Sequence, residues 1–163
     1  MTAPLTAPML ERRRIEAEIL GLMYKTLVAE FDEETAKRLI ARTVHQSAIT
    51  QGKALADALE GPTSLQSFVD ILHLWTAGGT LETEVVRQDD EVFEFRVTRC
   101  RYSEMYKDMG LSDLGGILSC HRDGTMCEGY DTNLKMTRTQ TIMEGASHCD
   151  FRFDYSKSGN QNG

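Results

Sequence analysis

The chain has 163 residues, enough for one domain that buries roughly two-thirds of the surface exposed by its unfolded form. Its 18 Lys and Arg are outnumbered by 25 Asp and Glu, which gives a formal net charge of −7 at pH 7. This balance argues against a broad nucleic-acid-binding surface, because such surfaces neutralise phosphates with Lys and Arg. No apolar stretch reaches the ~18 residues of a membrane span, and the N-terminus lacks the pattern of a secretory signal. We therefore expect a cytoplasmic protein with reduced cysteines and with no nucleic-acid or membrane partner.

The first half of the chain has the apolar period of helices. A first helix is predicted from four residues at helical spacing, Ile15, Ile19, Leu22 and Met23. Asp32 is a good N-cap for a second helix, which residues 61–62 (Gly-Pro) stop. Thr63 with Gln66 resembles a capping box for a third helix, ended by the glycines at 78–79.

Beyond residue 80 the apolar period changes to two. Four strands are predicted, over residues 80–87, 91–100, 134–143 and 148–155. Helices over 102–109 and 112–128 are predicted between the second and third strands. The fold class is therefore α+β, with N-terminal helices followed by an antiparallel sheet that carries a helical insertion. A single domain over residues 10–155 is expected, between a disordered start (1–9) and a disordered tail (156–163).

Alternation places aromatic residues on one face of two of these strands. The second strand carries Phe93, Phe95 and Val97 on one face, and the last strand carries Cys149, Phe151, Phe153 and Tyr155. The opposite face of the last strand holds polar residues.

The four cysteines all lie in the second half: Cys100, Cys120, Cys127 and Cys149. In a helix Cys120 and Asp123 share a face at i, i+3 spacing, and a lone carboxylate is costly to bury. His121 points away from the Cys120 face, and His148 and Cys149 point to opposite faces of a strand, so neither neighbour is an automatic base. A nucleophilic thiolate needs a nearby cation or hydrogen-bond donors. The candidates for that role are His121, His148, Arg138 and Arg99.

Simpler interpretations stand beside a catalytic one. Free cysteine is usually a small buried hydrophobe, which suits Cys149 in its aromatic stripe and Cys127 beside Met126. A zinc site can be drawn from Cys120, Cys127, His148 and Cys149, but the chain has no C-x-x-C pair. Phosphate-loop, dinucleotide-binding, serine-hydrolase and zinc-protease motifs are also missing, so no cofactor is expected.

From residue 97 onward, several motif blocks occur in a familiar order. They are RCRYSEMY at 99–106, CHRD at 120–123, TRTQTIMEG at 137–145 and CDFRF at 149–153. Together these blocks resemble the L-2-amino-thiazoline-4-carboxylic acid hydrolase family. The resemblance covers about residues 97–155, and the helical first half is similar only in organisation.

The resemblance implies hydrolytic opening of a small nitrogen heterocycle. In the family reaction, water adds at the aminothiazoline carbon that is bonded to sulfur and to two nitrogens, which gives N-carbamoyl-cysteine. The family's motif cysteines map to Cys100, Cys120 and Cys149, and its acids to Asp123 and the turn residue Glu144. Relatives acting on hydantoin-like, lactam or imide rings would carry the same blocks, so the ring itself is left open.

We therefore expect a hydrolase of non-peptide C–N or C–S bonds with a cysteine-containing site. Cys120 is the expected nucleophile, with Cys149 in that role as one alternative and an activated water as another. Asp123 and Glu144 are the candidate acid and base groups. Arg138 is expected to hold a substrate carboxylate as a fork, and the other substrate-site candidates are Cys100, His121 and His148. A non-catalytic small-molecule-binding or sensor domain and a zinc-stabilised module are the competing classes, and a homo-oligomer is expected.

Overall fold

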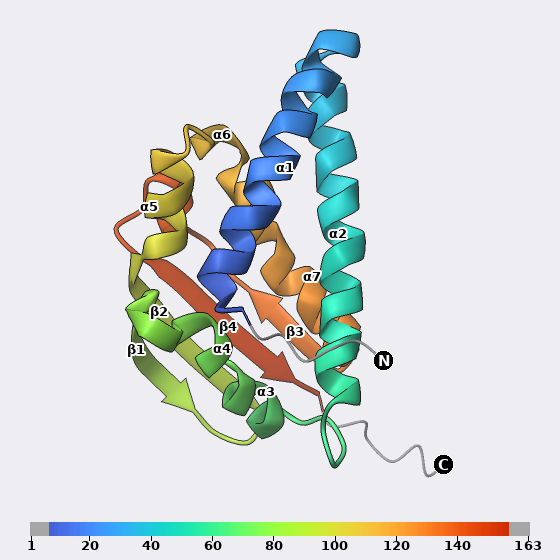
Figure 1. Ribbon diagram of the computed structural model, residues 1–163. Coiled ribbons are helices and arrows are strands. Elements are labelled where there is room, and N and C mark those ends of the chain that lie inside the picture. The colour runs from blue at the N-terminus through green and yellow to red at the C-terminus, as the bar shows by residue number, and fades with distance from the viewer. Residues whose placement is uncertain (1–6, 157–163) are drawn as a thin grey trace.

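The computed structural model describes residues 7–156, and within them the fold is α+β, as predicted. The helices are α1 (Met9–Glu30), α2 (Glu33–Asp57), α3 (Leu65–Ile71), α4 (His73–Thr76), α5 (Arg101–Asp108), α6 (Ser112–Gly115) and α7 (His121–Tyr130). The strands are β1 (Leu81–Gln88), β2 (Val92–Cys100), β3 (Leu134–Thr137) and β4 (Cys149–Tyr155). They form one antiparallel sheet in the order β1-β2-β4-β3 (Figure 1). Of the segments predicted to be disordered, 1–9 and 156–163, the structure describes only residues 7–9 and 156, and Met9 is already the first residue of α1.

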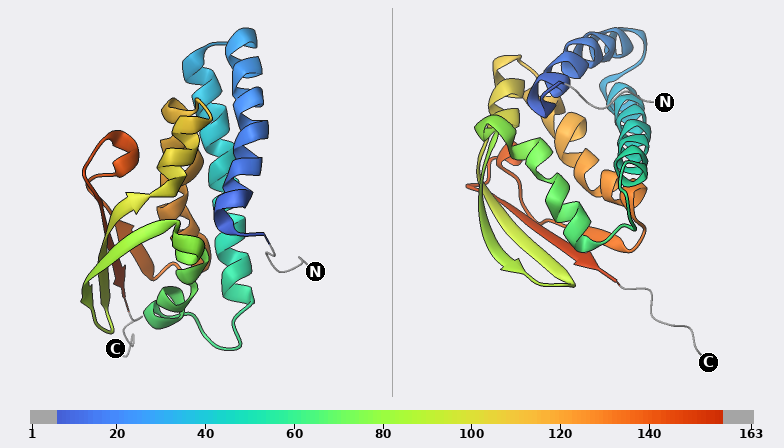
Figure 2. Two further views of the ribbon diagram at one scale, coloured as in Figure 1. Left: turned by 60° about the vertical axis from the view of Figure 1, so that its left-hand side comes forward. Right: turned by 60° about the horizontal axis from the view of Figure 1, so that its bottom comes forward.

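The helices lie in layers on one face of the sheet. The α7 helix packs between β3 and α2, and α1 runs antiparallel to α2 on the outside (Figure 2). The short α3 helix covers the same face of β2 and β4. Over residues 7–156, no helix has the length and apolar character that a membrane crossing requires.

The pairing of β2 with β4 sets the inner face of the sheet. Phe95 stands opposite Phe151, and Val97 stands opposite Cys149. These side chains face the helices, while Arg152 on the outer face forms an ion pair with Glu94. The aromatic residues that alternation put on one face of each strand therefore point into the core.

Glycines bring α2 and α7 into direct backbone contact. A Cβ atom added at Gly52 would lie 2.1 Å from the carbonyl oxygen of Met126, and one added at Gly129 would lie 2.3 Å from that of Ile49. Only glycine leaves the backbones room to approach this closely. The contact fixes α7 between α2 and the sheet.

The caps of the N-terminal helices follow the sequence in one case and depart from it in another. The carboxylate of Asp32 accepts the backbone N–H of Thr35 at 2.8 Å, so the predicted N-cap of α2 is confirmed. The capping box of α3 is formed by Ser64 and Ser67 instead of by Thr63 and Gln66. The hydroxyl of Thr63 donates a hydrogen bond to Asp131, a contact between segments far apart in the chain.

The helical insertion and the third strand are more broken than predicted. The single helix expected over 112–128 is divided into α6, a π-helical turn (Gly116–Cys120) and α7. The strand expected over 134–143 ends at Thr137, because two backbone N–H groups shortly after it, those of Thr139 and Gln140, donate to the Asp150 carboxylate at 2.9 Å. A side chain has thus replaced the strand partner that would continue the ladder.

The predicted first helix is present, but its apolar stripe faces outward. The side chains of the stripe are about half or more exposed: Ile15 (49%), Ile19 (65%), Leu22 (63%) and Met23 (51%). The buried side of α1 instead carries small residues such as Ala17 and Gly21. A Cβ atom at Gly21 would meet Leu111 at 3.2 Å, so small residues allow the close approach of α1 to the rest of the fold.

Candidate functional site

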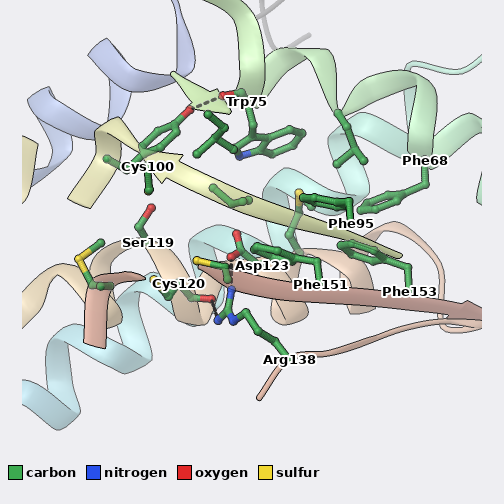
Figure 3. A pocket seen from close by; sticks show the side chains of 17 residues that line it. Phe68, Trp75, Phe95, Cys100, Ser119, Cys120, Asp123, Arg138, Phe151 and Phe153 are labelled. Carbon is green, nitrogen blue, oxygen red and sulfur yellow. Dashed lines mark hydrogen bonds and ion pairs between the residues drawn. The ribbon is translucent and has the colours of Figure 1, made fainter. Parts of the chain in front are cut away.

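A pocket of about 80 Å³ lies between the inner face of the sheet and the helices. One side, which we call the aromatic wall, consists of Phe68, Phe95, Phe151 and Phe153. The other side, which we call the polar wall, consists of Ser119, Cys120, Asp123 and Arg138 (Figure 3). Further lining residues include Trp75, Cys100, Tyr102, Met126, Met143 and Cys149.

The aromatic wall is a product of strand register. The rings of Phe95 and Phe151, cross-strand partners on β2 and β4, stack with centroids 4.9 Å apart and an angle of 5° between their planes. The ring of Phe153, two residues along β4, has its centroid 6.1 Å from that of Phe151, with an angle of 7° between the two ring planes. Near-parallel rings present a flat apolar surface, which suits the face of a small planar ring.

Arg138 joins the polar wall to the aromatic wall. Its Nη1 donates to the Oδ2 of Asp123 at 2.7 Å, and its Nη2 donates to the carbonyl oxygen of Cys120 at 2.9 Å. The guanidinium carbon also lies 4.9 Å from the ring centroid of Phe151, a cation–π distance. Two guanidinium nitrogens are thus engaged within the protein, so a carboxylate fork at Arg138 would have to displace these bonds or use its remaining N–H groups.

Asp123 is an acid whose environment disfavours its charge. Its side chain is 30% accessible and lines the pocket. Burial raises the pKa of the carboxyl group, although Arg138 opposes that rise through its charge and its hydrogen bond. A carboxyl group with a raised pKa in a pocket is suited to accept and return protons.

The thiols of Cys100, Cys120 and Cys149 line the same pocket. Burial raises the pKa of Cys100 to about 11. Burial also raises the pKa of Cys120, and the negative charge of Asp123 adds to that rise. Cys149 accepts the backbone N–H of Ile142 at 3.2 Å, yet burial still raises its pKa. All three are therefore protonated thiols at neutral pH in the unliganded site.

A second, polar recess of about 110 Å³ adjoins the pocket. It shares Cys120 and Arg138 with the pocket, and His121 and Glu144 line it as well. The Glu144 carboxylate accepts a hydrogen bond from the hydroxyl of its own cap residue, Thr141, at 2.9 Å. An acid held in this way is part of a turn and still borders the recess.

The sequence-based candidates thus separate into three places. The pocket brings together Cys100, Cys120, Asp123, Arg138 and Cys149. The recess adds His121 and Glu144. His148 lines neither space, and its ring nitrogens contact Ser147 and Gln140.

The fourth cysteine lies apart from the other three, and the candidate zinc ligands form no metal site within residues 7–156. Cys127, one turn beyond Asp123 on α7, is buried in the core outside the pocket. In the described part of the chain, no three of His, Cys, Asp and Glu are placed to hold a metal ion together.

Sequence reasoning missed several residues that line the pocket. Tyr102 donates its hydroxyl to the carbonyl oxygen of Trp75 at 3.1 Å, which links α5 to the end of α4. Tyr102 stands inside the first motif block, and Trp75 is the only tryptophan in the sequence, so both had a signal. Ser119 lies next to Cys120 in the π-helical turn. No apolar period in that turn indicated that its side chain lines the pocket.

Comparison with known proteins places the chain in a family. A solved structure with a similar fold is the phenol-responsive sensory domain of the transcription activator PoxR with phenol, at 14% identity and a TM-score of 0.54, covering 85% of this chain and 73% of that chain. At that identity the likeness shows the fold alone. No curated protein matches the chain. The family model described as L-2-amino-thiazoline-4-carboxylic acid hydrolase matches residues 12–153, and so includes the N-terminal helices that the motif blocks do not reach. The chain therefore belongs to the L-2-amino-thiazoline-4-carboxylic acid hydrolase family.

Proposed function

We propose that this protein hydrolyses a small cyclic amidine or amide in the pocket between the aromatic and polar walls, with 2-aminothiazoline-4-carboxylate as the reference substrate. Family membership supports a hydrolase of that substrate class. The observation that carries the placement of the reaction is the meeting of Asp123, Cys120 and Arg138 at one wall of the pocket. Acid, thiol and cation are groups that such a ring opening can use.

The dimensions of the pocket support a substrate of this size. A single water needs about 10–15 Å³ of such space, so about 80 Å³ accommodates several water-sized groups. A five-membered ring with its substituents is in this range. Stacked against Phe151, the ring would present its electrophilic carbon toward the polar wall.

The first half of the proposed reaction transfers the substrate to Cys120. The Asp123 carboxylate takes the thiol proton of Cys120, and the sulfur attacks the ring carbon bonded to sulfur and two nitrogens. The ring C–S bond then breaks, and the departing ring sulfur takes the proton back from Asp123. The product of this half is an isothiourea linked to Cys120.

The second half consumes one water. Its oxygen attacks the same carbon, the bond from that carbon to Cys120 breaks, and Asp123 passes one water proton to the Cys120 sulfur. The other proton goes to the imine nitrogen, which leaves the urea group of N-carbamoyl-cysteine. Arg138 positions Asp123 throughout and favours its charged form. In the alternative course, Asp123 activates water for direct attack, and Cys120 only lines the site.

A product assay with matched cysteine variants tests the proposal. The purified protein is incubated with a panel of aminothiazolines, hydantoins and lactams, and ring-opened products are measured by mass spectrometry. Cys120→Ala is expected to lower kcat by a factor of about 10² or more, whereas Cys127→Ala, which alters a thiol outside the pocket, is expected to retain activity. Loss of activity in both variants, with both folded, would contradict the role of Cys120. Full activity of Cys120→Ala would favour direct attack by water.

A non-catalytic binding domain is the second candidate function. The largely aromatic lining and the protonated state of the pocket thiols favour it, because both suit retention of a ligand without bond breaking. Saturable binding of the panel compounds without product from any of them would select this function. Turnover of even one ring would exclude it.

A further inference from the structure

Behind the polar wall, a cluster of arginines surrounds one carboxylate. Arg13 of α1 and Arg122 of α7 are only 3% and 5% exposed. Arg13 donates to Glu16 at 2.8 Å and to the amide oxygen of Gln51 at 2.9 Å. Arg122 lies 3.5 Å from the same Glu16 and donates to Ser47 at 3.0 Å. Two buried cations therefore share one acid.

The cluster has more positive than negative charge. Arg12 also pairs with Glu16, at 3.0 Å, so three guanidinium groups face one carboxylate. The next acid, Asp123, already pairs with Arg138. Burial and the charge of Arg13 lower the pKa of Arg122 to about 10. Buried charges are costly unless they are paired, so this cluster favours the arrival of an anion.

Two hydrogen-bond donors of the cluster, Nη1 of Arg12 and Nε of Arg122, are buried and have no acceptor among the described residues. Arg122 and Arg13 line a small cavity of about 10 Å³. That volume accommodates about one oxygen atom of a ligand.

This small cavity, which we call the branch, adjoins the main pocket. The two spaces share four lining residues, Trp75, Ser119, Asp123 and Met126. An oxygen atom in the branch would therefore belong to a molecule whose ring occupies the main pocket. A carboxylate attached directly to a small ring has that shape and supplies the missing negative charge.

We infer that Arg13 and Arg122 form an anion subsite that selects heterocyclic acids by binding their carboxylate, with Arg122 as the main donor. The inference rests on the proposed function in taking the main pocket as the substrate site. It assigns substrate selection to Arg13 of α1 and Arg122 of α7. None of the motif cysteines or acids has that role. Arg138, whose Nη atoms donate to Asp123 and to the carbonyl oxygen of Cys120, then positions the Asp123 carboxylate and does not bind the ligand's carboxylate.

Equilibrium binding of inert rings tests the subsite without turnover. Trp75, the only tryptophan, lines both spaces, so its fluorescence reports ligand binding. The probes are 2-aminothiazole-4-carboxylate and 2-aminothiazole, aromatic rings that differ only in the carboxylate. We expect the wild-type protein to bind the acid at least about tenfold more tightly, because charged hydrogen bonds are the strong ones. Arg122→Gln is expected to remove this preference and to leave affinity for the neutral ring within about twofold.

A variant with the opposite expected sign and a distant control complete the test. Glu16→Gln removes the acid shared by the arginines and is expected to tighten binding of the carboxylate probe by about threefold or more. Arg99→Gln alters an exposed arginine paired with Glu104, away from the pocket, and is expected to change neither affinity. If Arg122→Gln does not fold, the affinities of Arg122→Lys and Glu16→Gln for the two probes test the subsite in its place.

Two outcomes would overturn the inference. One is equal affinity of the wild-type protein for the two probes, which would mean that the branch holds only a water molecule. The other is a loss of affinity for the carboxylate probe that is no larger in Arg122→Gln than in Arg99→Gln. A preference for the acid that depends on Arg122, found together with no turnover of any ring, would retain the subsite and contradict only the proposed hydrolysis.

Discussion

The two walls of the pocket are built in different ways. The aromatic wall comes mainly from adjacent strands, and its rings stack because β2 and β4 pair in regular register. The polar wall comes from a π-helical turn, the first turn of α7 that continues it, and the residue after β3, so no regular ladder aligns its side chains. Irregular helical turns of this kind occur frequently at functional sites. The regular sheet thus supplies shape, and the segments of the polar wall supply the reactive groups.

The largest expected effect comes from removing the charge of the polar wall. Asp123→Asn keeps the size of the side chain but cannot accept the proton of Cys120 or of water. We expect kcat to fall by a factor of about 10²–10⁴, the usual contribution of a general base. Steady-state kinetics on the substrate found in the product assay measures this, with Asp108→Asn, an exposed acid at the end of α5, as the matched control.

The pH profile distinguishes a proton-transfer role from a structural one. The reaction needs the Asp123 carboxylate, and burial raises its pKa above the ordinary value of 3.8. Activity should therefore decrease as the pH falls through that raised pKa, at a higher pH than an exposed carboxyl group would titrate. Asp123→Asn should lose this acidic limb. A limb that is unchanged in the variant would assign it to another group.

The second effect tests whether the helix packing holds the polar wall in place. Gly52→Ala puts a methyl group 2.1 Å from a backbone oxygen of α7, so α2 and α7 have to separate. We expect a loss of about 3 kcal/mol in the free energy of unfolding, at the upper end for overpacking. Urea denaturation measures it. Gly61→Ala, with nothing within 4 Å of its added Cβ, is the control and should remain close to wild type.

The third effect concerns the thiols, which the apolar lining keeps protonated. A rise in the pKa of Cys100 from 9.0 to about 11 lowers its thiolate fraction at pH 8 about 100-fold. Because the thiolate is the reactive form, iodoacetamide should label Cys100 at about one hundredth of the rate of free cysteine. Peptide mapping after timed quenching gives the rate. Labelling as fast as that of free cysteine would show that the pocket is wetter than the structure indicates.

The smallest effect sharpens the role of the aromatic wall. Phe151→Leu removes the ring stacked on Phe95 and the face that contacts Arg138. We expect a loss of about 1 kcal/mol in substrate binding, seen as about a fivefold rise in KM with little change in kcat. Phe93→Leu, in the core but outside the pocket, should leave KM unchanged. A large fall in kcat for Phe151→Leu would mean that this wall also orients Arg138.

Sequence reasoning succeeded where one physical rule acted alone. Alternation in the strands predicted the shared faces that carry Phe95 and Phe151, and side-chain chemistry predicted the Asp32 cap. The i, i+3 spacing of Cys120 and Asp123 correctly put both on one face, and both line the pocket.

It failed where segments distant in the chain compete for the same groups. The third strand ends early because the Asp150 carboxylate takes backbone N–H groups that the ladder would use. The apolar stripe of α1 gave the correct period, yet small residues on the opposite side decide which face is buried. The partnership of Arg13 with Arg122 depends on how α1, α2 and α7 pack together, which no local pattern contains.

The protonated thiols of the pocket also have a consequence for oxidative damage. Peroxide attacks the thiolate, and susceptibility to sulfenic acid formation follows thiolate character and exposure. A pocket that keeps Cys100, Cys120 and Cys149 as thiols therefore shields them from oxidation while no ligand is bound. A protonated amidine entering the pocket would bring the positive charge that favours a thiolate. Such a ring would therefore raise the thiolate character of these cysteines while it blocks the access of peroxide to them.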